Sequence, residues 1–141
     1  MDRQGPDGIE TWPGLVPELL VTNLAASLGF YVEAVGFDLV DRRTDPEFAL
    51  VRLGTSLIML EEIEPGGWIT GELEAPFGRG VNFEIEHPDP RGLSGALEAR
   101  GHALFRPLRR TEYVSRGATI AQWEFLVCDP DGYLLRFVHE D

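Results

Sequence analysis

The sequence of 141 residues has one cysteine, no long apolar run, and only 12 basic side chains against 24 acidic ones. The lone Cys128 cannot form a disulfide within the chain. The first residues do not pair a basic segment with an apolar run and a cleavage site, as a secretory signal does. The longest uncharged apolar runs, such as 57–60, have the length of a strand and are too short to span a bilayer. These absences predict a cytoplasmic protein with no membrane partner.

The charge balance gives a formal net charge of −12 and an isoelectric point near 4.6. Nucleic-acid binding requires a basic footprint on the protein, so we expect no nucleic-acid partner. A negative field raises the local concentration of cationic ligands, although solubility is the simpler explanation of the charge taken alone. The charge is therefore compatible with a cationic ligand and does not by itself require one.

The sequence has no recognised catalytic motif. The three histidines do not form an HxxxH or HxH pair, and no Ser-His-Asp order or phosphate-binding glycine loop is present. Cys128 follows an apolar run and has no neighbouring His or Lys that would lower the pKa of its thiol, which favours an inert core side chain over a nucleophile. We therefore expect no catalytic residue and no cofactor.

Periodicity and turn residues predict two modules with the same order of elements. Residues 1–14 contain five Gly or Pro residues and no periodicity, which is typical of an arm outside the core. In the first half, the expected elements are a strand at 15–22, a helix at 24–35 capped by Asn23 and ended by Gly36, and strands at 37–43, 47–53 and 56–63. A Gly/Pro-rich connector follows at 64–80. In the second half, we expect a strand at 81–86, a helix opened by Asp89-Pro90 and ended by Gly101, and strands at 102–110, 119–128 and 133–138. The pattern predicts a single α+β domain of two βαβββ modules, at about 15–63 and 80–139.

One stretch, "DPDGYLLRF" at 129–137, predicts a tight turn followed by a strand. Arg136 is the only charge between Tyr133 and Val138 in this strand. A cation in that position must be paired, extend to solvent or line a cavity.

Two motifs carry a resemblance to a known family. They are "N-L-x-x-S-x-x-F-Y-x-x-x-x-G-F" at 23–37 and "D-P-D-G-Y" at 129–133. In this order, with the βαβββ repeat between them, they resemble the vicinal oxygen chelate superfamily, which includes glyoxalase I, extradiol dioxygenases, fosfomycin-resistance enzymes and bleomycin resistance proteins. The resemblance covers about 15–138, and the stretches "PELLV", "FGRGVNFEIE" and "FLVCDPDGYLLRF" are most similar to the bleomycin resistance branch. It implies a curled, cup-shaped mixed sheet with flanking helices, and a homodimer.

The resemblance also bears on metal binding, because enzymes of the superfamily hold a divalent metal with His and Glu side chains. The corresponding positions here carry Val16, Gly80, Glu61 and Arg136. Neither Val16 nor Gly80 can coordinate a metal, and a guanidinium has no lone pair to donate. We therefore expect no metal and a non-enzymatic protein. Arg136 is expected to point into the cup and to pair with Glu61, although a solvent-facing Arg136 is the alternative.

Aromatic and acidic side chains on the expected inner strands and connectors predict the ligand. The expected ligand-binding residues are Phe48, Trp68, Tyr113, Trp123, Asp45, Glu47, Glu61 and Arg136. Flat rings grip planar groups at a low entropic cost, and carboxylates attract a positive tail. The resemblance supplies a ligand of this kind, a bleomycin-type glycopeptide antibiotic that is bound without chemical change. A metal-dependent lyase or dioxygenase with other metal ligands, and a binder of an unrelated metabolite, are the alternatives.

Overall fold

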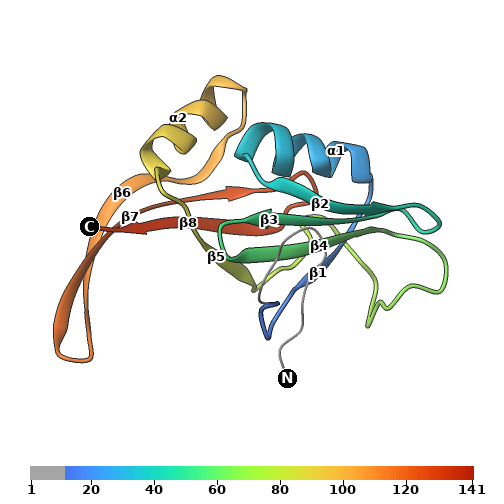
Figure 1. The fold of residues 1–141 in the computed structure, drawn as a ribbon, viewed down its shortest axis with the longest axis horizontal. Coiled ribbons are helices and arrows are strands. Elements are labelled where there is room, and N and C mark those ends of the chain that lie inside the picture. The colour runs from blue at the N-terminus through green and yellow to red at the C-terminus, as the bar shows by residue number, and fades with distance from the viewer. Residues whose placement is uncertain (1–11) are drawn as a thin grey trace. The chain divides into compact units, whose positions relative to one another are not determined.

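The computed structural model describes residues 12–141, so most of the predicted arm lies outside the described residues. The chain separates into two compact units, Met1–Leu73 and Glu74–Asp141 (Figure 1). None of the helices in residues 12–141 has the length and apolar character required to cross a bilayer.

The first unit is a four-stranded sheet with one helical segment. Its elements are β1 (Glu18–Val21), α1 (Leu24–Leu28), η1 (Gly29–Val35), β2 (Asp38–Arg43), β3 (Phe48–Leu53) and β4 (Ser56–Glu62). The strand order is β1-β4-β3-β2. Strand β1 runs parallel to β4, and the other neighbours are antiparallel.

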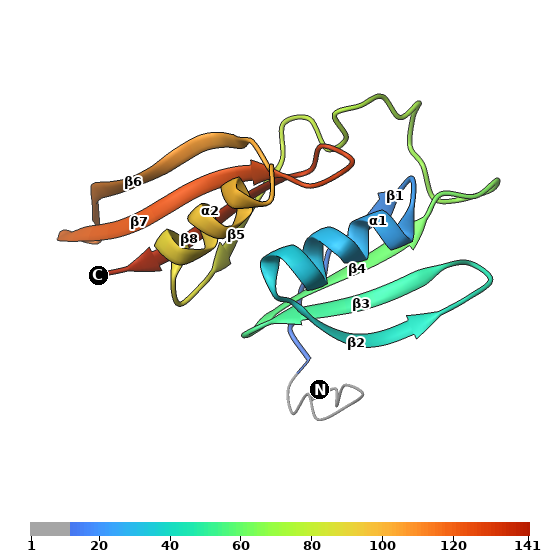
Figure 2. The same cartoon turned by 90° about the horizontal axis from the view of Figure 1, so that it is seen from above.

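The second unit repeats this arrangement. Its elements are β5 (Asn82–Glu86), α2 (Pro90–Ala99), β6 (Leu104–Ser115), β7 (Ala118–Cys128) and β8 (Leu134–Glu140). The strand order is β5-β8-β7-β6, with β5 parallel to β8 (Figure 2). The predicted α+β class with two βαβββ modules is therefore confirmed, and neither sheet closes on itself. The cup that the two sheets were expected to form together stays a prediction.

The first helical segment begins and ends where the sequence predicts. The side chain of Asn23 accepts a hydrogen bond from the Ala26 N–H at 3.0 Å, and Gly36 adopts a φ of 101° after the last turn. The difference lies in the second half, where 29–35 form a wider π-helix and the N–H groups of Gly36 and Phe37 both donate to the carbonyl of Tyr31. Apolar spacing over so few turns does not distinguish this wider helix from an α-helix.

Strand β6 extends five residues beyond the predicted end at residue 110. It continues to Ser115 and turns through Arg116 and Gly117, whose φ values are 51° and 79°. Two central residues with positive φ form the type of two-residue turn that suits the twist of a hairpin. Residues 111–118 were not predicted to form a hairpin because this turn has Arg where Asn or Asp is usual.

One face of each sheet packs on its helical segment and forms the core. Fully buried side chains in the first unit include Val21, Tyr31, Val51 and Leu60, and those in the second include Leu97, Phe125, Leu135 and Phe137. The rings of Phe125 and Phe137 stack with their centroids 5.4 Å apart. Each core therefore lies between a sheet and a helix, and the second face of each sheet carries no helix from the described part of its own unit.

The turn predicted from "DPDG" is present and is fixed by its first residue. The Oδ1 atom of Asp129 accepts hydrogen bonds from the N–H groups of Asp131 and Tyr133, each at 2.9 Å. Gly132 has a φ of 99°, and a Cβ atom at this position would overlap the side chain of Pro76. Glycine is required here both by the backbone conformation and by the close approach of the preceding loop.

Gly132→Ala and Gly95→Ala form a matched pair that tests this requirement. We expect Gly132→Ala to lower the free energy of unfolding by more than about 1 kcal/mol, because the conformation is strained for alanine and Pro76 must move. Gly95 lies inside α2, where a Cβ atom would meet open space, so Gly95→Ala is expected to raise the free energy of unfolding by about 0.5–1 kcal/mol. Urea unfolding measures both, and equal effects would contradict the account of the turn.

Candidate functional site

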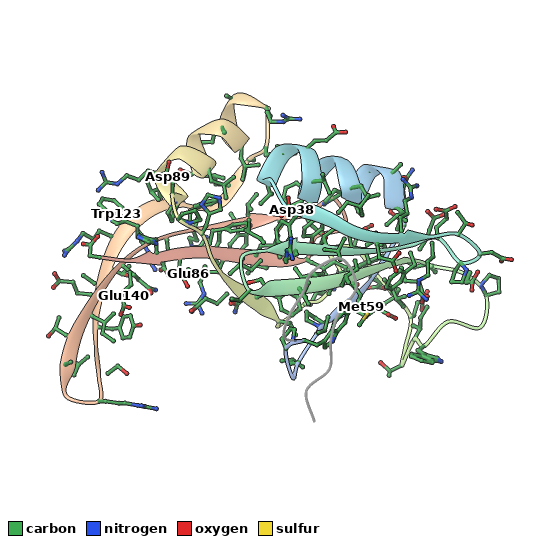
Figure 3. The ribbon with its side chains drawn as sticks, viewed as in Figure 1. Asp38, Met59, Glu86, Asp89, Trp123 and Glu140 are labelled. Carbon is green, nitrogen blue, oxygen red and sulfur yellow. The ribbon has the colours of Figure 1, made fainter. Side chains whose placement is uncertain are left out.

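The second face of the first sheet is apolar over most of its area. Val40, Phe48, Leu50 and Leu57 form a buried cluster, and Trp12, Val16 and Met59 pack against it. Met59 is labelled in Figure 3. Val16, which the resemblance matched to a metal-binding His of the superfamily's enzymes, thus contributes to this apolar packing. The described end of the arm covers part of a sheet face in its own unit.

A pocket of about 100 Å³ opens at one end of this face. It is lined by Arg43, Thr44, Asp45, Pro46, Phe48 and Glu61. The register explains the grouping, because Arg43 on β2 lies opposite Phe48 on β3, and Phe48 lies opposite Glu61 on β4. Three residues that were predicted from the sequence to bind ligand, Asp45, Phe48 and Glu61, therefore line one cavity.

The guanidinium of Arg43 lies over the ring of Phe48, which forms the aromatic wall of the pocket. The Cζ atom of Arg43 lies 4.0 Å from the centroid of the Phe48 ring, and its Nε atom lies 3.7 Å from Oδ2 of Asp41. On the neighbouring strand β1, partial burial raises the pKa of the Glu18 carboxyl, the nearby Glu61 carboxylate raises it further, and Arg43 opposes both effects. The end of the first sheet thus combines several carboxylates with one cation.

Glu47, also predicted to bind ligand, has a different environment. Its Oε2 atom lies 3.5 Å from a terminal nitrogen of Arg42, and Glu47 does not line the pocket. The structure therefore associates Glu47 with a half-exposed ion pair beside the pocket.

The second face of the second sheet carries a row of alternating charges, one from each strand. The row consists of Glu84 on β5, Arg136 on β8, Glu124 on β7 and Arg109 on β6. Arg136 contacts Glu84 at 2.8 Å and Glu124 at 3.8 Å, and Arg109 contacts Glu124 at 3.2 Å. Glu124, with a side chain only 8% exposed, also accepts a hydrogen bond from the amide of Gln122. We call these four residues the charged row.

The charged row explains the lone charge in the last strand. Arg136 is paired within its own sheet, as a partly buried cation must be. The predicted pair of Arg136 with Glu61, which belongs to the other unit, stays a prediction. The other members of the row were not predicted as partners of Arg136, although the alternation of polar and apolar residues along β5 was a usable signal.

Trp123 lies on the helix-bearing face of the second sheet. The guanidinium of Arg91, on α2, lies 3.8 Å from the Trp123 ring (Figure 3). Because successive residues of a strand point to opposite faces, Trp123 and Glu124 do not share a face. Trp123 also donates a hydrogen bond to the Asp141 carboxylate, whose pKa is lowered first by Arg110 and to a lesser extent by this bond.

The other two predicted aromatic contacts are exposed. Trp68 is 92% exposed in the connector after β4, and Tyr113 is 45% exposed on the β6–β7 hairpin. Of the four predicted aromatic residues, Phe48 is the one that shares a described pocket with carboxylates.

Residues that could perform other chemistry have structural roles. Burial raises the pKa of the Cys128 thiol, and Asp129 adds to the effect, so a reactive thiolate is disfavoured. Burial lowers the pKa of His87, whose Nδ1 accepts a hydrogen bond from the Asp89 N–H at the start of α2. Within residues 12–141, no three His, Cys, Asp or Glu side chains are grouped as a metal site requires. The expected absence of a metal stays a prediction.

Glu124→Gln and Glu84→Gln test the charged row. Glu124 is buried between two arginines, so removing its charge is expected to lower the free energy of unfolding by about 1–3 kcal/mol. Glu84 is half-exposed, and its replacement is expected to cost less than about 1 kcal/mol. Urea unfolding in low and high salt provides the measurement. A Glu84→Gln effect as large as that of Glu124→Gln would refute the ranking.

Comparison with solved structures finds the same fold in other proteins. TioX from Micromonospora sp. ML1 superposes with a TM-score of 0.67 at 20% identity, covering 92% of this chain and all of its own. A glyoxalase/bleomycin resistance protein/dioxygenase from Alicyclobacillus acidocaldarius superposes with a TM-score of 0.61 at 18% identity, covering 89% of each chain.

A third solved structure is more similar in sequence. It is a glyoxalase/bleomycin resistance protein/dioxygenase superfamily member from Vibrio splendidus 12B01, 32% identical over 86% of this chain and 93% of its own, with a TM-score of 0.40. No model of a known protein family matches the chain, and no curated protein does. The chain therefore shares its fold with TioX and with the glyoxalase/bleomycin resistance protein/dioxygenase from Alicyclobacillus acidocaldarius.

Proposed function

We propose that the protein binds and sequesters a cationic, partly planar small molecule of the bleomycin group without changing it chemically. The observation that carries the proposal is the pocket in which the ring of Phe48 lies with the carboxylates of Asp45 and Glu61. An aromatic wall with nearby carboxylates suits a ligand that has a planar ring system and a positive tail. Bleomycin-type glycopeptides have both features, and the resemblance to the bleomycin resistance branch supports this choice.

Binding without catalysis is the part of the proposal that rests on residue types. A divalent metal with a catalytic role needs about three protein ligands. Of the four positions that hold the metal in the superfamily's enzymes, only the one occupied by Glu61 has a side chain that can coordinate. Val16 packs in an apolar cluster, and Arg136 is committed to the charged row. These residues favour a binding protein over a metal-dependent lyase or dioxygenase.

The size of the pocket limits what it can hold. Sites for drug-sized ligands have volumes of about 300–1,000 Å³, and the pocket beside Phe48 has about 100 Å³. It therefore accommodates one end of such a ligand, and its carboxylates favour the cationic end. The remainder of the ligand would lie outside the pocket. Contacts of the ligand with Trp68, Tyr113 and Trp123 stay predictions from the sequence.

Calorimetric titration with metal-free bleomycin tests the proposal. We expect the double variant Asp45→Asn/Glu61→Gln to bind at least about tenfold more weakly than the wild type, because two charge-assisted contacts are lost. Added salt should also weaken binding, since exposed charges are screened over about 10 Å at 0.1 M. Trp68→Ala and Trp123→Ala test the aromatic contacts in the same titration.

Glu98→Gln is the control for a change in net charge, because Glu98 is exposed on α2 in the second unit. It is expected to bind as the wild type does. Micromolar affinity corresponds to a binding free energy of about −8 kcal/mol. If the wild type gives no heat of binding at ligand concentrations on the order of tens of micromolar, the bleomycin assignment is rejected. The protein would then be better described as a binder of an unrelated metabolite.

We also propose a homodimer. Both sheets are open, so β1, β2, β5 and β6 are edge strands, a type of strand that can pair with another chain. Large apolar side chains are exposed on β6, including Phe105 and Val114. Trp12, at the described end of the arm, packs on a sheet of its own unit, so it provides no argument for a contact with a partner.

Light scattering at micromolar concentration checks the oligomeric state. The expected mass is about twice the 15.7 kDa of one chain. A mass equal to that of one chain across the concentration range would exclude the dimer.

A further inference from the structure

The side chain of Arg43 lies over the ring of Phe48, which is the place where a cationic group of a ligand would stack. Its guanidinium carbon lies 4.0 Å from the centroid of the Phe48 ring. It also lines the same pocket as Asp45 and Glu61. Proteins use this combination of a ring face with nearby carboxylates to bind guanidinium groups.

The contacts that hold Arg43 in this position are weak. Its ion pair with Asp41 has an N–O distance of 3.7 Å, beyond that of a good hydrogen bond, and its side chain is 64% exposed. Exposed pairs of this kind contribute little to stability. The guanidinium of Arg43 can therefore leave the ring at low cost if another group takes its place.

We propose that Arg43 is an internal competitor for the cationic end of the ligand, and that the ligand group which displaces it is a guanidinium or amidinium. The incoming group would stack on Phe48 and lie beside the carboxylates of Asp45 and Glu61. This inference rests on the proposed function in using the same pocket. It goes further in naming the chemical class of the bound group and in making Arg43 a determinant of specificity.

Charge explains why displacement is favoured over simple addition. With Arg43 in place, the pocket already holds one cation with its two carboxylates. A second cation beside it would be repelled, whereas an exchange leaves the charge of the pocket unchanged. The influence of Arg43 extends to β1, where it lowers the pKa of the Glu18 carboxyl that burial and Glu61 raise.

The shape of the group also matters. A guanidinium is planar, weakly hydrated and able to stack on a ring, while an ammonium is a compact and strongly hydrated point charge. A site vacated by Arg43 therefore favours a planar cation over a primary amine. This preference separates the proposal from simple attraction of any positive charge.

The test is a nuclear magnetic resonance titration of the full chain with methylguanidinium, using the backbone amides of Thr44 and Phe48 as reporters. We expect Arg43→Ala to bind methylguanidinium about two- to fivefold more tightly than the wild type, the range that an exposed cation–π contact supports. The same variant should prefer methylguanidinium to methylammonium, and it should not bind neutral N-methylurea. Arg43→Gln keeps part of the aliphatic stem and provides a second variant with the same expected gain.

Arg42→Ala is the matched control. It removes the same charge from the neighbouring residue, which pairs with Glu47 and does not line the pocket. A gain in Arg42→Ala equal to that in Arg43→Ala would show that net charge, and not displacement, controls binding. That result overturns the inference, as does a failure of both Arg43 variants to bind methylguanidinium more tightly than the wild type.

Titration of the same proteins with metal-free bleomycin separates this inference from the proposed function. If the wild type and Arg43→Ala bind bleomycin equally well, sequestration stands and the role of Arg43 is refuted. If methylguanidinium binds with the expected pattern and bleomycin does not bind, the cation site stands and the drug assignment fails.

Discussion

Each unit pairs a four-stranded sheet with a single helical segment, and a helical segment covers only one face of a sheet. The other face must be covered by something else or must tolerate water. This constraint determines which side chains the two units can place there. In the first unit the face is apolar, and Trp12 and Val16 pack against its cluster. In the second unit it is polar, and the charged row runs across all four strands.

The two solutions have different energetic consequences. Apolar side chains gain stability from burial at roughly 25 cal/mol per Å², so the first face favours any group that covers it. The charged row gains little from cover, because each ion must keep its partner if water is removed. Glu124 illustrates this, since its buried carboxylate is neutralised by arginines on both neighbouring strands. The same topology thus produces a face with an apolar cluster in one unit and a face with paired charges in the other.

Much of the fold could be predicted from the sequence because it depends on local signals. Asn23, Gly36 and the Asp129 turn each fix a chain direction through backbone chemistry that is independent of distant residues. The site was less predictable, because it depends on register between strands. Asp45, Phe48 and Glu61 were selected for their chemistry, but Arg43 was not, and only the pairing of β2 with β3 brings it onto Phe48. Trp123 shows the reverse case, in which a shift of one residue along a strand changes the face to which a side chain belongs.

The parallel pairing in each unit has a consequence for how such chains can be assembled. In both sheets the first strand of the module is hydrogen-bonded to its last strand, β1 to β4 and β5 to β8. The chain therefore enters each module through one strand and leaves it through the neighbouring strand. Insertion in the segment 64–75 need not disturb the hydrogen-bond ladder of either sheet, because this segment lies between the bond of Ile63 to Val21 and the contacts of Pro76 and Phe77 with the turn before β8. A gene encoding one such module can be duplicated in tandem with a joining peptide of almost any length, and each copy keeps its own complete sheet.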